Sequence, residues 1–159
     1  FAPTILSLVL AGVVGSKIAS ELGNMRISEQ IDALEIMGIN TKNYLILPKI
    51  LGAFTMVPIL VGISAVVGIW GGYVVGNYTG SVPSEIFLTG IRQGVVINYM
   101  VIALYKSFIF SFIISTVPCY FGYNVKGGAL EIGKAGTQSV VVSCILILIA
   151  DYIVAAIAL

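Results

Sequence analysis

The segment from Gly127 to Thr137, GGALEIGKAGT, is a near-match to a nucleotide-binding loop. From Gly128 it reads G-x-x-x-x-G-K, but Ala135 stands where such a loop has the Ser or Thr whose hydroxyl binds magnesium. A phosphate-binding loop also joins a strand to a helix in an α/β domain, whereas this segment lies between two long apolar runs. We therefore expect no ATP to bind here, and interpret the glycines as a flexible turn into the last apolar run.

The other reactive side chains do not indicate catalysis either. The chain has no histidine, which excludes imidazole catalysis and most zinc sites within it. Cys119 and Cys144 lie far apart in apolar sequence without C-x-x-C spacing, so we interpret both as buried apolar side chains and not as a disulfide. The net charge of +1 gives no reason to expect nucleic acid as a partner. We predict no catalytic residue and no metal or cofactor site in this chain.

The composition is typical of a membrane protein. Hydrophobic residues make up 58% of the 159 residues and charged residues 9%, against about 25% charged in soluble domains. A helix needs about 20 apolar residues to cross the hydrocarbon core, and an open sheet edge would find no hydrogen-bond partner there. Four runs are long enough: 2–22, a stretch within 44–78, 96–121 and 137–159. We predict an all-α integral membrane protein, a polytopic bundle of about four transmembrane helices forming one domain over 1–159.

The distribution of basic residues predicts the orientation of these spans. The loop between the first two spans carries Arg26 and Lys42, and the loop between the last two carries Lys126 and Lys134. The loop between the second and third spans has a single basic residue. The positive-inside rule therefore predicts that the first and third loops are cytoplasmic, and that 77–95 and the C-terminus face outward.

A short helix over 28–37 is predicted in the first cytoplasmic loop, where the sequence reads ISEQIDALEIMG. Ser28 is placed as an N-cap, since its hydroxyl can accept from a backbone N–H of the first turn. Glu29 and Asp32 lie in that turn, where the helix dipole favours acidic groups. Gly38 follows the helix as a C′ residue would. The helix is too short and too acidic to span the membrane.

The two faces of this short helix differ, and they allow two interpretations. Ile27, Ile31 and Leu34 lie on one face, whereas the acidic side chains keep to the other. The helix is either an interfacial cap on the bundle or a docking helix that a cytoplasmic partner grips. The residues of the candidate docking helix are Ser28, Glu29, Ile31, Asp32, Leu34, Glu35 and Met37.

Small residues recur at four-residue spacing in two spans, which lets membrane helices approach closely. The ladder in the second span consists of Gly68, Gly72, Gly76 and Gly80. The ladder in the first span consists of Ala11, Gly15, Ala19 and Gly23. We interpret both as helix-packing surfaces, and the sequence leaves open which of them packs within the chain and which between chains.

Four charged residues lie within the predicted spans, where a charge is costly unless it is paired or faces a cavity. Lys17 and Glu21 are four residues apart on one helix and can pair locally. Lys106 and Asp151 lie deep in the third and fourth spans. They either neutralise each other between neighbouring helices or form a polar patch that lines a substrate path or a moving interface, and the sequence does not separate these interpretations.

The chain resembles the MlaE/YrbE-type permeases, the membrane subunits of MCE-associated ABC transporters. The resemblance covers essentially all 159 residues. It rests on LVLAGVVGSKIASELGNMRISEQIDALEIMGIN, LPKILGAF, VGIWGGYVVG, LYKSFIFSF and GKAGTQSVVVSCILILIADYIV, with 21–38 as the most specific part. The chain starts at Phe1 without a basic n-region, so we do not expect a signal peptide. The resemblance implies that an interfacial helix and one further span precede it, which makes five spans in the complete subunit.

The resemblance also implies a function. Two permease copies pair in the bacterial inner membrane, two cytoplasmic ABC ATPases that bind ATP and magnesium dock beneath them, and a periplasmic MCE-domain protein sits on the outer side. Phospholipid or a related lipid moves between the membrane and that protein, so the chain itself is not an enzyme. The 28–37 helix corresponds to the coupling helix that the ATPase grips, and Glu21, Lys106 and Asp151 match charged positions of the family. The outer segment 77–95, with Ser84 as an N-cap, is expected to form a short helix near the MCE protein.

One departure from the family concerns the first span. Members commonly have an Arg directly after its glycine, where this chain has Val13. Lys17 follows one helical turn later and would restore a positive charge to the same face. We hypothesise that Lys17 partners Glu21 or Asp151, in which case Lys17→Ala should impair transport more than Lys42→Ala.

Two other functions remain open at this stage. An ion-coupled secondary transporter could be built around Lys106 and Asp151, although the chain shows neither inverted repeats nor paired broken helices. A non-transporting membrane scaffold could use the glycine ladders for assembly alone. Dependence on a proton gradient would favour the first alternative, and lipid flux that survives loss of the docking helix would favour the second.

Overall fold

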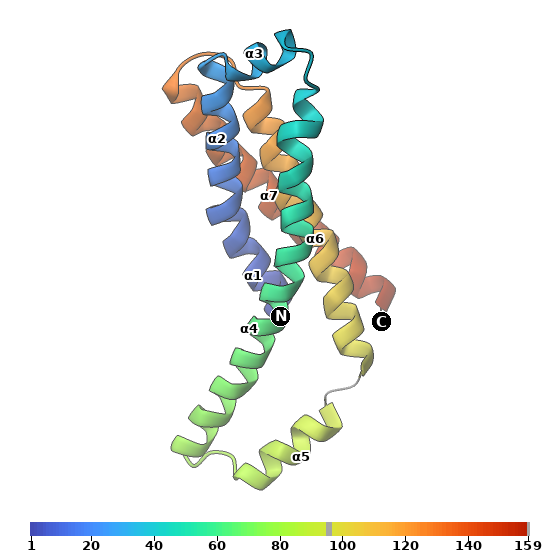
Figure 1. Ribbon diagram of the computed structural model, residues 1–159. Helices are drawn as coiled ribbons and strands as arrows, with labels where there is room; N and C mark the ends of the chain where they lie inside the picture. Colours follow the sequence, from blue (N-terminus) through green and yellow to red (C-terminus); the bar gives the residue numbers. More distant parts are fainter. Residues whose placement is uncertain (95–96, 159) are drawn as a thin grey trace.

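The computed structural model describes residues 1–94 and 97–158, and within them the chain forms helices joined by short turns, without a strand (Figure 1). Four helical segments are long and apolar enough to cross a membrane: Ala2–Ile27, Lys42–Tyr78, Ile97–Tyr123 and Ala129–Ala158. The predicted all-α class and the four predicted spans are therefore confirmed.

The first two spans each contain a π-helical turn. The first consists of α1 (Ala2–Leu10), η1 (Ala11–Gly15) and α2 (Ser16–Ile27), and the second of η2 (Lys42–Ile46) and α4 (Leu47–Tyr78). The other helices are α3 (Gln30–Ile36), α5 (Ser84–Gly94), α6 (Ile97–Tyr123) and α7 (Ala129–Ala158). The predicted start of the last span was wrong. Helix begins at Ala129, so most of the glycine-rich segment forms the first turns of α7 and only Gly127 and Gly128 belong to the turn before it.

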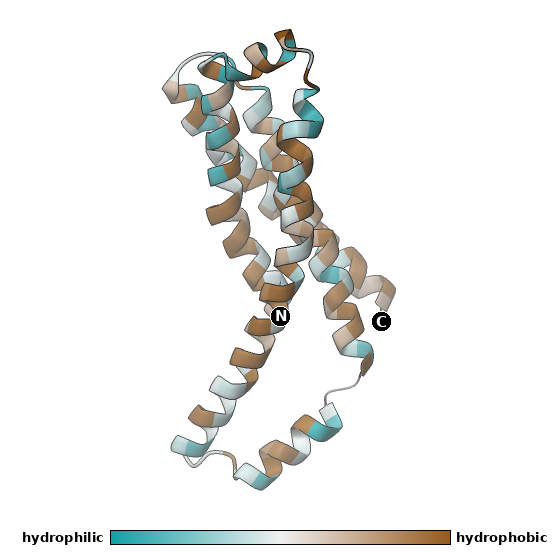
Figure 2. Ribbon diagram, viewed as in Figure 1, coloured by the Kyte–Doolittle hydropathy of each residue, from teal (hydrophilic) through white to brown (hydrophobic). Residues whose placement is uncertain are grey.

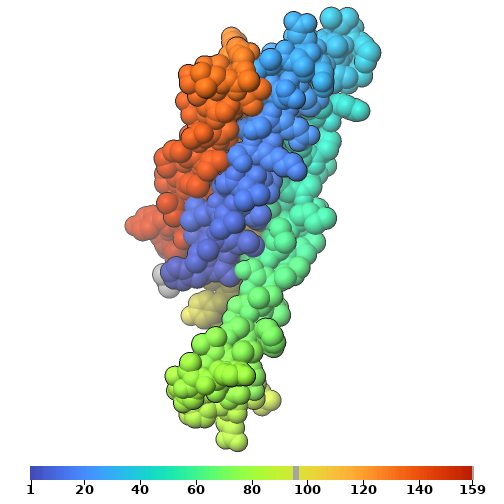
Figure 3. Space-filling model, turned by 90° about the vertical axis from the view of Figure 1, so that its left-hand side faces the viewer, coloured from blue at the N-terminus to red at the C-terminus, as the bar shows by residue number. Residues whose placement is uncertain are grey.

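The two ends of the bundle carry different elements. α3 and the loop between α6 and α7 lie together at one end, which we call the α3 end, and α5 lies at the opposite end (Figure 1). Polar residues gather at the α3 end, whereas the spans are mostly apolar (Figure 2). This agrees with the predicted grouping of the first and third loops on one side. The distal part of α4 and α5 extend beyond the other helices (Figure 3).

The core of the bundle is built from small side chains along α6. Ser107, Ser111 and Ser115 repeat every four residues and are fully buried. Their hydroxyls donate to carbonyls of their own helix, from Ser107 to Leu104 at 2.7 Å and from Ser115 to Ser111 at 2.8 Å. A hydroxyl satisfied in this way costs little when buried, and its small volume lets the neighbouring helices come close.

The first-span ladder packs within this chain. Ala11 and Ala19 are fully buried, and a Cβ added to Gly15 would lie 3.2 Å from the ring of Pro118 in α6. The closest approach is at Gly122 of α6, where a Cβ would lie 2.6 Å from the carbonyl oxygen of Ala19. α2 and α6 are therefore in backbone contact at this point.

The second-span ladder has no such partner in the part of the chain that the structure describes. A Cβ added to Gly68 would meet no atom within 4 Å, and one added to Gly72 would lie 3.8 Å from Phe87 of α5. A Cβ at Gly76 would lie 3.8 Å from Val82. Within residues 1–94 and 97–158, no spanning helix packs on these three glycines, so a use between chains stays open for this ladder.

The contact at Gly122 predicts a specific sensitivity. In Gly122→Ala the new methyl group would clash with the backbone of Ala19, which cannot move as a side chain can, so we expect a loss of about 1–3 kcal/mol. Gly62→Ala on α4 is the matched control, because its Cβ meets no described atom within 4 Å. Thermal unfolding of the full-length protein in detergent measures both, and equal melting temperatures would contradict the close α2–α6 contact.

Candidate functional site

α3 lies across the α3 end of the bundle with one face on its own chain and one face free (Figure 1). Ile31 is fully buried and Leu34 is half-buried, as the predicted apolar face requires. Ile36 and Met37 at the end of the helix are 87% and 67% exposed. The helix therefore presents an apolar tip that its own chain does not cover.

The boundaries of α3 differ from the prediction at its start. Ser28 is not its N-cap, because the Ser28 hydroxyl donates to the carbonyl of Asn24 at 2.7 Å and so ends α2. Glu29 takes the N-cap position with a φ of 61°, in the left-handed region. This sharp reversal between two helices explains why the chain does not continue from α2 into α3 as one helix.

The predicted end of α3 is confirmed. Gly38 has a φ of 77°, which a residue without a Cβ adopts freely. Its N–H donates to the carbonyl of Glu35 at 3.0 Å, and the N–H of Ile39 donates to that of Leu34 at 3.1 Å. These two bonds are the Schellman arrangement, in which the last carbonyls of a helix are satisfied by the chain that leaves it.

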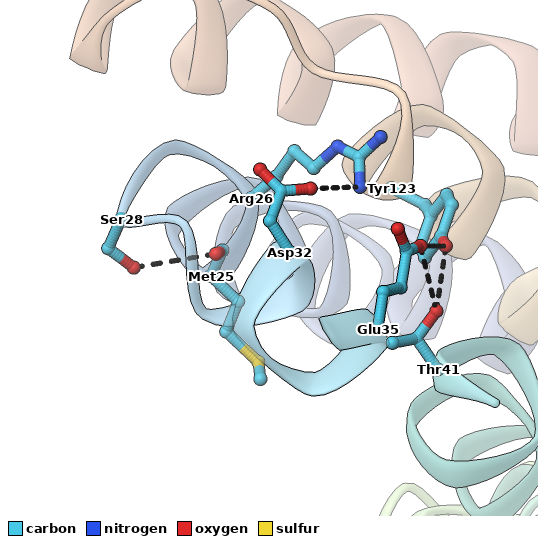
Figure 4. A network of polar contacts seen from close by, with 7 residues as sticks. All are labelled: Met25, Arg26, Ser28, Asp32, Glu35, Thr41 and Tyr123. Atoms are coloured by element: carbon cyan, nitrogen blue, oxygen red, sulfur yellow. Dashed lines mark hydrogen bonds and ion pairs between the residues drawn. The ribbon is translucent and has the colours of Figure 1, made fainter. Parts of the chain in front are cut away.

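A polar cluster attaches α3 to the second and third spans (Figure 4). The Glu35 carboxylate lies 3.2 Å from the Tyr123 hydroxyl and 3.4 Å from the Thr41 hydroxyl, and the two hydroxyls are 2.8 Å apart. Each hydroxyl has one proton and the carboxylate has none, so at most two of these three contacts are hydrogen bonds at any moment. Tyr123 ends α6 and Thr41 precedes η2, so one carboxylate of α3 is held by both spans.

Arg26 attaches α3 to the first span as well. Its guanidinium lies 3.5 Å from the Asp32 carboxylate and 5.0 Å from the centre of the Tyr123 ring, a cation–π distance (Figure 4). The Tyr123 ring therefore contacts Arg26 at the end of α2 while its hydroxyl reaches α3. The Tyr123 side chain, which belongs to the third span, therefore links the first span, the second span and α3.

Sequence reasoning identified Asp32 and Glu35 as docking residues but missed their partners Arg26, Thr41 and Tyr123. Tyr123 lies far along the sequence at the end of an apolar run, and its spacing to α3 carries no signal. Ile36, the most exposed residue of the apolar tip, was also missed. It lies outside the periodic apolar face that the pattern picked out.

The membrane-embedded charges Lys106 and Asp151 form a closed pair. The Lys106 ammonium lies 2.7 Å from the Asp151 carboxylate, joining α6 to α7. The Thr4 hydroxyl of α1 donates to the same carboxylate oxygen at 3.0 Å. This geometry agrees with the interpretation that the two charges neutralise each other between neighbouring helices, and adds a third helix to the contact.

The other two charges are not arranged as hypothesised. Glu21 pairs with Lys49 of α4 at 3.0 Å, and Asp151 pairs with Lys106. Lys17 is exposed and joins neither acid among the ion pairs of the described residues. The proposed partnership of Lys17 with Glu21 or Asp151 is therefore wrong. The two acids are paired with Lys49 and Lys106, which lie on neighbouring helices.

The glycine-rich segment is not arranged as a phosphate-binding loop. Lys134 lies within α7 and pairs with Glu131 one turn earlier at 3.1 Å, on a helix surface. Within residues 1–94 and 97–158, no group of three or more His, Cys, Asp or Glu side chains could hold a metal ion.

Comparison with known proteins identifies relatives along nearly the whole chain. The family model described as Permease MlaE matches residues 1–157. A protein of Rickettsia bellii named probable ABC transporter permease protein is 41% identical over 152 residues, which cover 96% of this chain and 59% of that protein. The chain thus spans about three-fifths of the length of such relatives.

Two further relatives come from photosynthetic organisms. The probable ABC transporter permease protein slr1045 of Synechocystis is 35% identical over 151 residues, covering 95% of this chain and 57% of that protein. The chloroplastic protein TRIGALACTOSYLDIACYLGLYCEROL 1 of Arabidopsis thaliana is 33% identical over 151 residues, covering 95% of this chain and 43% of that protein.

The Lys106–Asp151 pair predicts a non-additive response to mutation. Lys106→Met leaves the Asp151 carboxylate without its cation inside the membrane, which we expect to cost about 3 kcal/mol. Asp151→Leu should cost a similar amount, whereas the double variant removes both charges and should recover most of the loss. Thermal unfolding of the full-length protein in detergent measures the cycle. A double variant as unstable as the sum of the two single variants would contradict mutual neutralisation.

Proposed function

Because this chain belongs to the MlaE permease family, we propose that it is the membrane subunit of an ABC transporter that moves phospholipid or a related lipid. A separate cytoplasmic ATPase docks on α3 and supplies the energy, and ATP and magnesium bind to that partner. A second copy of the permease completes the membrane part. A periplasmic MCE-domain protein exchanges lipid with it at the opposite end, and the complex resides in the bacterial inner membrane.

The observation that carries the proposal is the exposed apolar tip of α3. Ile36 and Met37 are 87% and 67% exposed at the predicted cytoplasmic end. Exposed apolar side chains next to acidic ones are what a protein partner buries in a docking groove. Glu29 and Asp32 are exposed on the same short helix and provide the polar surround.

The attachment of α3 explains how docking could act on the spans. A partner that moves α3 also moves the Glu35 carboxylate, which is bonded to Thr41 before η2 and to Tyr123 at the end of α6. The buried Ile31 side chain resists sliding of the helix over its own chain. A displacement of α3 is therefore passed to the second and third spans through short contacts.

Two observations support lipid as the cargo. The Arabidopsis relative carries the name of a lipid, trigalactosyldiacylglycerol. A groove of about 310 Å³ runs between the first span and α4 with almost entirely apolar walls and Lys49 at one end. Acyl chains need such walls, whereas a polar solute would leave its own hydrogen bonds unmade there. The groove is lined by Leu10, Val14, Ile18, Lys49, Gly52, Ala53, Met56, Val57, Leu60 and Ile114.

Docking on α3 is tested with the full-length permease co-expressed with its ATPase partner. Ile36→Glu or Met37→Glu places a charge in the apolar contact, and we expect about tenfold less ATPase to co-purify. Ile86→Glu on α5 is the matched control, since Ile86 is 63% exposed at the opposite end. ATPase recovery as high with Ile36→Glu as with Ile86→Glu would exclude α3 as the docking helix.

The cargo is tested by reconstituting the complete complex in vesicles that contain fluorescent phospholipid. We expect ATP-dependent transfer of the labelled lipid to the MCE-domain partner, reduced to background by Ile36→Glu. A complex that assembles and hydrolyses ATP but moves no phospholipid would refute the cargo while leaving the docking proposal standing.

A further inference from the structure

A groove of about 370 Å³ separates the start of the second span from the end of α6 at the α3 end of the bundle. Its walls come from two antiparallel helices, so residues near the start of η2 face residues near the end of α6. The groove is lined by Lys42, Ile46, Ile50, Thr116, Cys119, Tyr120, Tyr123 and Asn124.

The polarity of this groove changes along its length. On one wall Lys42, Ile46 and Ile50 follow each other at one-turn spacing, from a charged group to two aliphatic ones. On the other wall Asn124 and Tyr123 lie at the end of α6, and the buried Cys119 lies deeper in the bundle, in the apolar cluster against which Ile46 packs. The groove is therefore cationic and polar at its mouth and apolar along its floor, which matches an amphiphile with an anionic head.

Exposed tyrosines near the mouth of the groove agree with a position at the membrane–water interface. Tyr44 and Tyr120 are 61% and 66% exposed on the two helices that form the groove. Aromatic side chains with a polar tip gather at the headgroup level of a bilayer. Lys42 lies within one turn of Tyr44 and so stands where the phosphate groups of that leaflet would be.

The charges around the mouth leave Lys42 free to bind an anion. In residues 1–94 and 97–158 the ion pairs use other cations, and Lys42 is exposed. The nearby carboxylate is Glu35, which accepts from the Thr41 and Tyr123 hydroxyls. The amide of Asn124 donates one hydrogen to the Tyr120 carbonyl at 2.8 Å and has a second hydrogen to offer.

We propose that this groove is a binding site for an anionic phospholipid of the leaflet on the α3 side. Lys42 holds the phosphate, the Asn124 amide donates to the headgroup, and one acyl chain lies along Ile46, Ile50 and Thr116. This site is separate from the apolar groove assigned to cargo, and the proposal does not depend on transport.

The bound lipid would touch the residues that position α3. Tyr123 lines the groove, and its hydroxyl is bonded to Thr41 and Glu35 (Figure 4). A lipid between η2 and α6 therefore fixes the spacing of the two spans that hold the Glu35 carboxylate. The composition of this leaflet thereby acts on the orientation of α3.

The site is tested by fluorescence quenching in the full-length protein. Trp70 is the single tryptophan of these 159 residues, so Trp70→Phe removes it and Tyr120→Trp places a reporter in the groove wall. The protein is reconstituted in vesicles of phosphatidylcholine with a minor fraction of acyl-brominated phosphatidylglycerol or, separately, acyl-brominated phosphatidylcholine. Quenching of the same protein without Tyr120→Trp is subtracted. We expect the phosphatidylglycerol to bind about fivefold more strongly, the contribution of one interfacial lysine.

The variants separate a specific site from a general surface effect. Lys42→Gln should abolish the preference, whereas Lys126→Gln, which removes an equally basic side chain outside the groove, should retain it. Ile50→Phe narrows the apolar floor and should weaken quenching by both lipids without altering Lys42. Equal quenching by both lipids in the protein with Trp70→Phe and Tyr120→Trp alone would overturn the proposal. So would an equal loss of the preference for phosphatidylglycerol in Lys42→Gln and Lys126→Gln. Absence of quenching by either lipid would show that protein covers the groove, which would overturn it as well.

Discussion

The backbone contact between α2 and α6 at Gly122 is the constraint on which the rest of the structure depends. A Cβ at this position would lie 2.6 Å from the Ala19 carbonyl oxygen, so no other residue fits without moving the helices apart. In a membrane the helices gain little from burying apolar surface against each other, because the lipid is equally apolar. Close approach is what dispersion and weak polar contacts require, and small residues along the first span and α6 provide it.

The contact at Gly122 also determines where Tyr123 lies. The next residue of α6 emerges beside the end of α2, so that its ring contacts Arg26 and its hydroxyl reaches Thr41 and Glu35. The short α3 is too brief to be stable as an isolated helix in water, and it is held by these contacts and by the buried Ile31. Helix packing inside the membrane thus positions the helix that we propose the ATPase grips outside it.

The charged residues within the spans serve the same assembly. Lys106 and Asp151 join α6 to α7 with Thr4 of α1 beside them, and Glu21 and Lys49 join α2 to α4. Each of these two pairs crosses a helix interface and joins helices that are distant in sequence. Lys42 is not part of these pairs, and it lies at the mouth of an amphiphilic groove, where we propose that a lipid phosphate binds it.

Local sequence was enough to predict the all-α membrane class, the four spans, the short helix after the first span and the end of that helix at Gly38. Hydropathy, span length and helix-end chemistry are local properties that a run of residues carries without its neighbours. The tertiary structure decided the partners: Lys49 for Glu21 instead of Lys17, Tyr123 and Thr41 for Glu35, and the absence of a packed helix on Gly68 in the described residues. The true starts of α3 and α7 were also decided there. The partners and the helix starts depend on which helices pack together and on how far each is shifted along its neighbour. Side-chain volumes at all helix interfaces set that packing together. No single stretch of sequence carries this information.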